Sequence, residues 1–373
     1  MSRLSYLKEN ALNAICPYFT MFPLEYPLRH LNKHKKNAPV IMDPFCGRGT
    51  TLFAARKLGL NAWGVDSSPV AVAIAKAKLA TCEEGQILEL AQRLLCREPQ
   101  EVPTSEFFNK LYSPGTLRDV CALREGLLAL EADDTNASVL LRALALGALH
   151  GPLNKDVESS IYFSNQMPRT FASKPDYSVR YWDERGMRPP QIDVLRVLRR
   201  KLERLSNLGM LKAGSYQQVI QSDSQSENLL QRVANDFSIV VTSPPYYGMR
   251  TYVQDQWLRH WFLGADPEVD YSSGPQLEHC GVNAFAESLG KVWKNMAASD
   301  ASTLRMFVRF GIIPSAKVDA KEVMKRSLEA SNVNWNIVSV RSADTASKGK
   351  RQATQMKSKS AAAIEYDYHI VRE

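Results

Sequence analysis

Short apolar runs alternate along this chain with longer segments in which apolar residues recur every three or four positions. The runs at 39–43 and 237–241 are mainly apolar, which is typical of strands buried on both faces of a parallel sheet. Helical spacing follows the first run at 51–58 and returns at 69–78. This alternation predicts an α/β protein with a Rossmann-like, mostly parallel sheet.

The same pattern continues towards the C-terminus. Further strands are predicted at 61–66, 216–223 and 303–310, and a terminal antiparallel hairpin at 335–341 and 363–372. Further helices are predicted at 27–32, 229–236, 252–263, 285–296 and 318–332. Within the aromatic helix 252–263, Trp257 and Trp261 are expected to pack on the sheet.

A long, mainly helical segment separates the first strands from the later ones. It predicts a large helical insertion over residues 83–212, within a catalytic domain made of 1–82 and 213–373. Its last part, 151–190, is less regular, and a basic helix with arginines on its solvated face follows. The insertion is a candidate region for recognising a nucleic-acid target.

Composition narrows the class of protein. The chain has 373 residues, of which 45% are hydrophobic, and no run of about 18 apolar residues that would predict a membrane span. Its six cysteines show no CxxC pair or histidine partner pattern, so we expect neither a metal site nor disulfides, in keeping with a cytoplasmic protein. The formal net charge of +8 is compatible with a polyanionic partner.

A glycine loop, residues 44–50, joins the first predicted strand to its helix. Gly47 and Gly49 let the backbone approach a ligand closely, and the helix N-terminus offers unpaired N–H groups. Asp66, at the end of the next strand, is placed to accept hydrogen bonds from ribose hydroxyls. The alternative is a structural turn. Together, the loop, the helix and Asp66 favour a cofactor site.

The loop differs from the two common phosphate-binding motifs. Position 52 is leucine, so GxGxxG is not completed, and no Gly-Lys-Ser/Thr ends a P-loop. Asp43 directly precedes the loop and would repel a pyrophosphate. A cationic ligand such as S-adenosylmethionine suits this charge better. Asp223, after a later strand, either contacts an adenine amine or caps the following helix.

The segment 242–248, Thr-Ser-Pro-Pro-Tyr-Tyr-Gly, follows a predicted buried strand. Two prolines end the strand and hold the preceding carbonyls, those of Ser243 and Pro244, in fixed directions. A stiff array of acceptors beside Tyr246 can hold a planar ring that carries an amine. The alternative is a proline-rich loop whose tyrosines only pack.

Two further stretches combine basic residues with aromatic or small polar ones. Over 151–190, aromatic residues interleave with Arg169, Lys174 and Arg180, a composition that suits stacking on bases and contacting phosphates. The connection 341–360 contains Lys348, Lys350 and Arg351. The alternatives are aromatics tucked into the core and a plain exposed loop tip.

The two motifs together resemble the S-adenosylmethionine-dependent DNA amino-methyltransferases, which methylate cytosine N4 or adenine N6. Residues 43–50 match the family's DPFxGxGT motif, residues 243–246 match its (D/N/S)PP(Y/F) motif, and residues 18–23 are similar to its aromatic-proline element. The resemblance implies S-adenosyl-L-methionine as cofactor. It also implies cofactor contacts by Thr20, Asp43, Cys46, Gly47, Gly49, Thr50, Asp66 and Asp223.

The resemblance implies roles for the second motif as well. Ser243 and the carbonyl of Pro244 would accept hydrogen bonds from the target amine, Pro245 would stiffen the turn, and Tyr246 would stack on a base flipped from double-stranded DNA. Serine at the first position accompanies cytosine N4 more often than adenine N6. The remaining alternatives are an RNA base-amine methyltransferase and an inactive subunit that binds S-adenosylmethionine or nucleic acid.

The resemblance carries expectations about the protein's setting too. Many family members work in restriction-modification systems, so a cognate restriction endonuclease is a further expected partner. The insertion lies before Asp223, within the first half of the sheet, which departs from the family's usual layouts. The target-recognition role of 83–212 is therefore an expectation from composition alone.

Overall fold

The computed structural model describes residues 15–18, 23–152, 158–164, 166–168, 170–205, 216–233, 235–248, 253–270, 277, 281–313, 316, 318–343 and 364–372. The chain divides into two compact units. We call the first the sheet unit, which draws on Thr20–Ala75, Lys212–Thr251 and Gly274–Glu373. We call the second the helical unit, which draws on Met1–Phe19, Lys76–Leu211 and Tyr252–Ser273.

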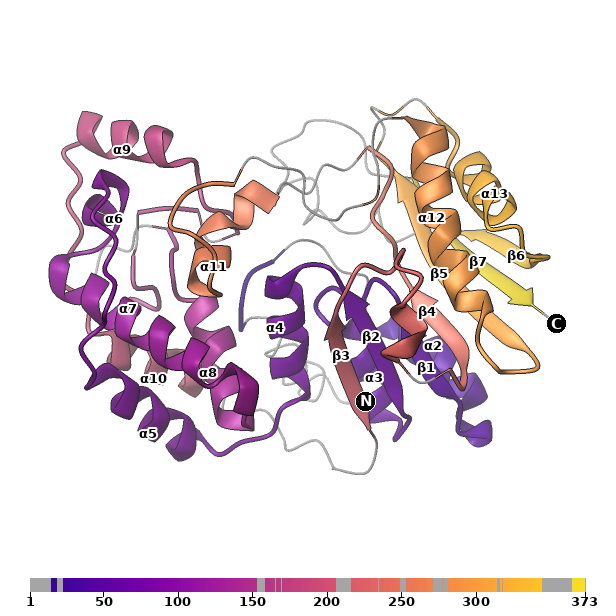
Figure 1. The fold of residues 1–373 in the computed structure, drawn as a ribbon, viewed down its shortest axis with the longest axis horizontal. Coiled ribbons are helices and arrows are strands. Elements are labelled where there is room, and N and C mark those ends of the chain that lie inside the picture. Colours follow the sequence, from indigo (N-terminus) through magenta and orange to yellow (C-terminus); the bar gives the residue numbers. More distant parts are fainter. Residues whose placement is uncertain are drawn as a thin grey trace. The chain divides into compact units, whose positions relative to one another are not determined.

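The sheet unit is built on a seven-stranded sheet with the order β3-β2-β1-β4-β5-β7-β6 (Figure 1). Its strands are β1 Val40–Asp43, β2 Ala62–Asp66, β3 Gln217–Gln221, β4 Phe237–Thr242, β5 Leu304–Ile312, β6 Asn336–Ser342 and β7 Ile364–Arg372. The first five are parallel, and β7 runs antiparallel between β5 and β6. The predicted α/β fold, with its C-terminal antiparallel hairpin, is confirmed.

Helices cover both faces of this sheet. They are α2 Glu25–His34, α3 Thr50–Lys57, α12 Val282–Ala297 and α13 Ala320–Ala330, while α4 Pro69–Leu79 begins in the sheet unit and ends in the helical unit. Along β5, Met306 and Val308 share a core with α12 and α13, which lie side by side (Figure 1). Phe307 points to the opposite face, since strand side chains alternate, and stacks on His30 of α2 at 4.2 Å.

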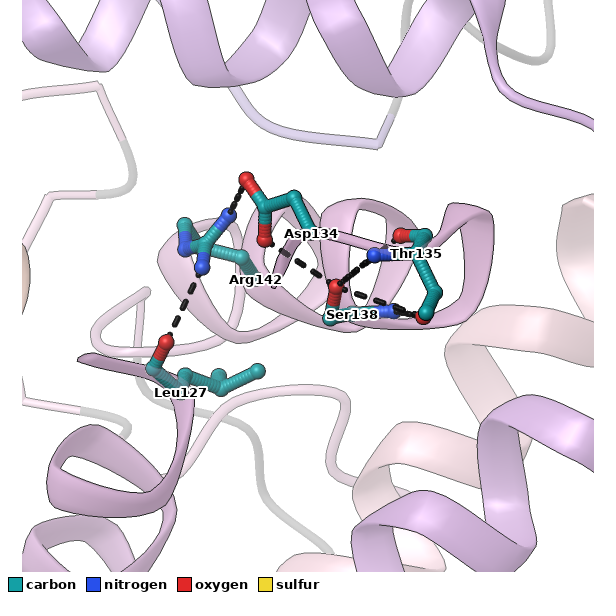
Figure 2. A network of polar contacts seen from close by, with 5 residues as sticks. All are labelled: Leu127, Asp134, Thr135, Ser138 and Arg142. Atoms are coloured by element: carbon teal, nitrogen blue, oxygen red, sulfur yellow. Dashed lines mark hydrogen bonds and ion pairs between the residues drawn. The ribbon is translucent and has the colours of Figure 1, made fainter. Parts of the chain in front are cut away.

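The helical unit contains most of the predicted insertion 83–212, together with Met1–Phe19 and Tyr252–Ser273 from the predicted catalytic domain. Its helices are α5 Glu84–Leu95, α6 Glu106–Leu111, α7 Pro114–Ala129, α8 Asn136–Leu146, α9 Pro175–Glu184, α10 Val194–Leu205 and α11 Trp257–Phe262, with 3₁₀ turns at Glu131–Asp133 and Val253–Gln256. A capping box between Thr135 and Ser138 starts α8 (Figure 2). One turn later, Arg142 pairs with Asp134 at 2.8 Å and donates to the carbonyl of Leu127 at 3.0 Å.

Two sequence predictions are wrong in detail. Trp257 and Trp261 do not pack on the sheet: Trp257 contacts the ring of Phe107 at 4.8 Å, and Trp261 contacts Phe108 at 4.7 Å, both within the helical unit. An amphipathic helix shows which face is buried, but not what covers that face. The helix predicted at 229–236 is only a 3₁₀ turn, Leu229–Gln231.

Candidate cofactor and base-binding site

The predicted site residues of the sheet unit follow four neighbouring strands. Asp43 and Asp66 end β1 and β2, while Asp223 and Ser243 come directly after β3 and β4. These strands are parallel and adjacent in the order β3-β2-β1-β4, so their carboxyl ends share one edge of the sheet. The structure thus brings Asp43 and Ser243, 200 positions apart in the sequence, to a common edge, where ligands of doubly wound sheets bind.

The glycine loop takes a left-handed backbone at two positions. Gly47 has φ 48° and Gly49 has φ 69°, a region that other residues rarely adopt. A Cβ on Gly49 would lie 3.0 Å from that of Ala75, whereas a Cβ on Gly47 would point into open space. Gly49 is also the N-cap of α3. The loop therefore leaves room beside Gly47 while it packs tightly against α4 at Gly49.

Asp66 holds this loop in place. Its Oδ2 accepts a hydrogen bond from the backbone N–H of Gly47 at 2.8 Å, and its Oδ1 accepts one from Ser68 at 2.9 Å. Burial raises the pKa of Asp66, and the two N–H donors oppose that rise. The backbone of Cys46 is fixed to the same strand by a 2.9 Å bond to the carbonyl of Val65. Contact between Asp66 and ribose stays a prediction.

Asp43 is buried at 1% exposure, and its two oxygens differ. Oδ1 accepts from the hydroxyl of Thr242 at 2.6 Å and from the backbone N–H of Phe45 at 3.1 Å. Oδ2 is buried with no hydrogen-bond partner among the described residues. The nearby Thr51 hydroxyl donates instead to the carbonyl of Val241 at 3.0 Å.

Burial accordingly raises the pKa of Asp43 to about 6, against the opposing hydrogen bonds from Thr242 and Phe45. A buried carboxylate with one unpaired oxygen is suited to a cationic group, which would supply the missing partner. The amino and sulfonium groups of S-adenosylmethionine fit this requirement. The room at Gly47 and the N-terminus of α3 fit the same cofactor.

The other predicted cofactor residues have different surroundings. The carboxylate of Asp223 accepts from the backbone N–H of Gln225 at 2.9 Å, so it stabilises a turn, and no α-helix follows it there. Thr50 and Cys46 are buried at 5% exposure. Thr20 lies outside the described residues. A cofactor role for each of these remains a prediction.

The Ser-Pro-Pro-Tyr segment leaves β4 at the same sheet edge. Gly248 has φ 83°, as expected of a residue that lets the chain turn away. Tyr246 is 8% exposed: its ring lies edge-on to Phe310, and its hydroxyl donates to Oε1 of Glu365 at 2.8 Å. Burial and Glu365 together raise the pKa of Tyr246 well above its ordinary value. Stacking of this ring on a base stays a prediction.

Sequence reasoning missed three residues that link these segments. The hydroxyl of Thr242 joins the second motif to Asp43, that of Ser224 donates to the carbonyl of Pro44, and Glu365 holds Tyr246. Thr242 and Ser224 adjoin predicted site residues, so a search of motif neighbours could have found them. Glu365 has no such signal, because it lies 119 positions from Tyr246.

The nucleic-acid candidates fall mostly outside the described residues: Arg169, Lys348, Lys350 and Arg351 cannot be placed. Lys174 precedes α9 as its N-cap, and Arg180 lies within this helix. On α9, Tyr177 and Tyr181 are 55% and 37% exposed, with ring centroids 6.1 Å apart. The Arg185 guanidinium lies 3.8 Å above the ring of Tyr181. Some aromatics of this region are buried, among them Tyr162, Phe163 and Trp182.

The described residues contain neither a membrane-spanning helix nor a cluster of metal-binding side chains. None of the helices placed by the structure combines the length and the apolar character that crossing a bilayer requires. Within the same residues, no three histidine, cysteine or carboxylate side chains gather where they could share a metal ion.

Comparison with known proteins extends this picture. Residues 2–77 match the family model of the N6/N4 methyltransferases, described as DNA methylase. A 68-residue segment is 37% identical to the Type II methyltransferase M.MjaII of Methanocaldococcus jannaschii. The resemblance to the DNA amino-methyltransferase family is confirmed. The matched segment covers 18% of this chain and only 13% of that methyltransferase.

A solved structure is similar only at a coarse level. The rRNA methyltransferase aviRa of Streptomyces viridochromogenes aligns with 94% of this chain and 86% of its own, at 12% identity. The TM-scores of its two structures are 0.31 and 0.32. A structural similarity this weak does not indicate a substrate for this chain.

Proposed function

We propose that this chain transfers a methyl group from S-adenosyl-L-methionine to the exocyclic amine of a flipped DNA base. The hydrogen bond from Thr242 to Asp43, 2.6 Å long, carries the proposal. It joins β4, which ends just before Ser243, to β1, which ends just before the cofactor loop. The proposed base-binding and cofactor-binding residues therefore follow adjacent strands. The match of residues 2–77 to DNA methylases supports the same function.

The proposed chemistry depends on holding a poor nucleophile. The lone pair of an exocyclic amine is delocalised into the ring, and bound S-adenosylmethionine would supply an electrophilic methyl group. Ser243 and the carbonyl of Pro244 accept the two amine hydrogens and favour a more tetrahedral nitrogen. Pro244 and Pro245 fix the direction of these acceptors, which removes much of the entropic penalty of alignment. Serine is a weak base, so proton loss follows methyl transfer.

Residues 174–185 of the helical unit are the proposed contact with nucleic acid. Tyr177 and Tyr181 offer exposed ring faces on one side of α9, and Arg185 covers one of them. Lys174 and Arg180 add positive charge to the same helix. Exposed aromatic rings with neighbouring cations suit unpaired bases and their phosphates. The wider assignment of 83–212 to target recognition rests on this patch.

Cytosine N4 is the proposed target because Ser243 begins the second motif. Adenine N6 is the second candidate within the same chemistry, and an RNA base amine is the third. An inactive subunit that only binds S-adenosylmethionine or nucleic acid is the alternative of a different class. A role in restriction-modification with a partner endonuclease, in the cytoplasm, belongs to the same proposal.

The decisive experiment uses labelled S-adenosylmethionine with duplex DNA or structured RNA, followed by mass spectrometry of the nucleosides. We expect N4-methylcytosine in DNA. N6-methyladenine would change the target base, and label confined to RNA would contradict the DNA proposal. Cofactor binding without methylation of any substrate would favour the inactive subunit.

A further inference from the structure

The connection from β3 to β4 begins with a tight turn, residues 223–226. The backbone N–H of Ser226 donates to the carbonyl of Asp223 at 3.1 Å, which closes the turn. Just before it, the N–H of Ser222 donates to the carbonyl of Asp66, also at 3.1 Å. The turn therefore starts beside the strand end that holds the glycine loop, at the carboxyl edge of the sheet.

Two side chains attach this turn to its surroundings. The hydroxyl of Ser224, 5% exposed, donates to the carbonyl of Pro44, the first residue of the glycine loop. The side-chain amide of Asn295 donates to the carbonyls of Ser224 and Ser226, both at 2.9 Å. Both neighbours are acceptors, so only the nitrogen of this amide can face them. The turn is thus joined to the glycine loop on one side and to α12 on the other.

α12 is a firm support for this attachment. The helix has 16 residues, and the side chains of Val292, Trp293 and Met296, which flank Asn295 in the sequence, are 0% exposed. The indole N–H of Trp293 also donates to the hydroxyl of Ser327 on α13 at 3.0 Å. A site held by a packed helix is positioned more precisely than one held by a loop. Asn295 therefore fixes the turn to a rigid part of the sheet unit.

The functional side chain of this turn is the carboxylate of Asp223. Its Oδ1 accepts from the backbone N–H of Gln225 at 2.9 Å. The side-chain amide of Gln225 lies farther away, at 3.3 Å from Oδ1 and 3.4 Å from Oδ2. A carboxylate offers about four acceptor positions. With one short bond and two long ones to the described residues, Asp223 keeps the capacity to accept a hydrogen bond from a ligand.

We propose that Asn295 and Ser224 are positioning residues, which hold the 223–226 turn against the glycine loop so that Asp223 accepts a hydrogen bond from the adenine amine of the cofactor. The inference rests on the proposed function, since it assigns the preparation of the same cofactor site. A loose turn would have to be ordered when the ligand binds, at a cost in conformational entropy. The bonds of Asn295 and Ser224 order it beforehand.

A purely structural role for Asn295 makes a different prediction. Loss of stability alone would weaken the binding of every cofactor analogue alike. Displacement of Asp223 would instead weaken only ligands that donate a hydrogen bond from the adenine ring. The ratio of two dissociation constants therefore separates positioning from general stability.

The test uses S-adenosylhomocysteine and its deaminated analogue, in which an oxygen replaces the adenine amine. Calorimetry at pH 8, without nucleic acid, gives the Kd of each ligand. The wild-type protein should bind S-adenosylhomocysteine at least about tenfold more tightly, because the oxygen cannot donate to Asp223. Asn295→Asp should reduce this ratio to less than about threefold, because a carboxylate cannot donate to the two carbonyls and the turn is released.

The matched control is Asn283→Asp on the same helix. The Asn283 side chain is exposed, and its Oδ1 accepts from Arg326 at 3.0 Å, which a carboxylate also does. This variant should keep the wild-type ratio. Ser224→Ala is a milder test, since it removes only the bond to Pro44, and it should lower the ratio as well. Thermal melts identify a variant that fails to fold, and Ser224→Ala decides if Asn295→Asp is unfolded.

A double variant tests whether Asn295 acts through Asp223. Asp223→Ala should remove the preference for the amine by itself. Adding Asn295→Asp to it should bring no further loss, because the side chain that Asn295 positions is already absent. A wild-type ratio in Asp223→Ala or in folded Asn295→Asp would overturn the inference.

Failure of the proposed function would look different. If the wild-type protein binds neither ligand, the proposed function and this inference are both overturned. If the ratios behave as expected but no base is methylated, only the proposed methyl transfer is overturned. If the wild-type protein methylates DNA and the ratio survives in the variants, only the roles of Asn295 and Ser224 are overturned.

Discussion

The two units differ in the charges that their described residues bury: the helical unit buries cations, whereas the sheet unit buries the carboxylates Asp43 and Glu365 together with Arg309. In the helical unit the buried cations donate to carbonyls at helix ends: Lys201 to Gly147 at 2.9 Å, Arg259 to Leu146 at 3.2 Å and Arg142 to Leu127 at 3.0 Å. The C-terminus of a helix carries partial negative charge and unpaired carbonyls, so these cations stabilise the scaffold.

At the carboxyl edge of the sheet lie the carboxylates of Asp43 and Glu365, which are buried, and that of Asp66, which is half-buried. Asp66 and Glu365 accept hydrogen bonds from other segments, and Asp43 keeps one oxygen without a partner among the described residues. Burial lowers the pKa of Lys201 to about 8 and raises that of Asp43 to about 6, so both charges are destabilised by their surroundings. The difference is that Lys201 has its acceptor within the protein, whereas Asp43 is suited to an outside cation.

The largest expected effect tests the chemistry of the sheet edge. Ser243→Ala should lower the methylation rate by at least about a hundredfold, because an acceptor for the target amine is lost. The Kd for S-adenosylmethionine, measured by calorimetry, should stay within about threefold of wild type. Ser238→Ala, at the other end of the same strand, is the matched control and should leave the rate unchanged. Loss of cofactor binding in Ser243→Ala would contradict the assignment.

The next effect tests the scaffold role of the buried cations. Arg142→Met leaves Asp134 and the carbonyl of Leu127 without their hydrogen-bond donor, and should lower the free energy of unfolding by about 3 kcal/mol. Urea denaturation would measure this loss, with cofactor affinity unchanged. The control is Arg326→Met on α13, which breaks an exposed pair with Glu322 and should lose less than about 0.5 kcal/mol. Equal losses in the free energy of unfolding of the two variants would contradict the scaffold role of the buried arginine.

Asp43→Asn tests the carboxylate of the sheet edge. Cofactor affinity should fall about tenfold at pH 8, because one attraction to a cationic ligand is removed. Wild-type affinity should weaken as the pH falls through about 6, where the carboxyl becomes protonated, and the variant should lose this dependence. Calorimetric titrations from pH 5 to pH 8 would detect the difference. A pH profile shared by both proteins would contradict it.

The same substitution has an opposite effect on stability. The folded-state pKa of Asp43 is raised from 3.8 to about 6, so its contribution to stability is greatest below pH 4 and is lost as the pH rises through 6. Without cofactor, Asp43→Asn should therefore be more stable than wild type at pH 8, by at most about 3 kcal/mol. Most of the loss in wild type falls between about pH 4 and pH 6, so thermal melts at pH 4 and pH 8 should show a much larger gain at the higher pH.

The smallest expected effect concerns the aromatic patch on α9. Replacing Tyr177 and Tyr181 together with alanine should weaken binding of single-stranded DNA about fivefold, because two exposed ring faces are removed. Replacing both with phenylalanine keeps the rings and should preserve the affinity in fluorescence anisotropy. Wild-type affinity for the alanine variant would remove α9 from the proposed contact surface.

Local patterns explain why much of the site was predictable. The glycine loop and Asp66 belong to one continuous strand-helix-strand unit, so short-range spacing was enough to bring them together. The apolar runs fixed β1 and β4, and parallel pairing then placed Ser243 at the same edge as Asp43.

Contacts between distant segments were not predictable in the same way. Thr242 meets Asp43 across 199 positions, and Tyr246 meets Glu365 across 119, so neither pair leaves a local pattern. The apolar face of α11 was visible, yet its partners Phe107 and Phe108 lie about 150 positions away in the sequence, although all belong to the helical unit. Burial can be inferred from spacing, but the identity of a partner cannot.

The order of the strands has a consequence for synthesis on the ribosome. β1 and β2 are complete at Asp66, but their outer neighbours β4 and β3 begin at Phe237 and Gln217. At roughly 5–20 residues per second, the roughly 150 residues between β2 and β3, most of them in the helical unit, delay β3 by roughly 8–30 s. Throughout that interval the nascent β1–β2 pair has two unpaired edges, so this step is where a chaperone would improve the yield of folded protein.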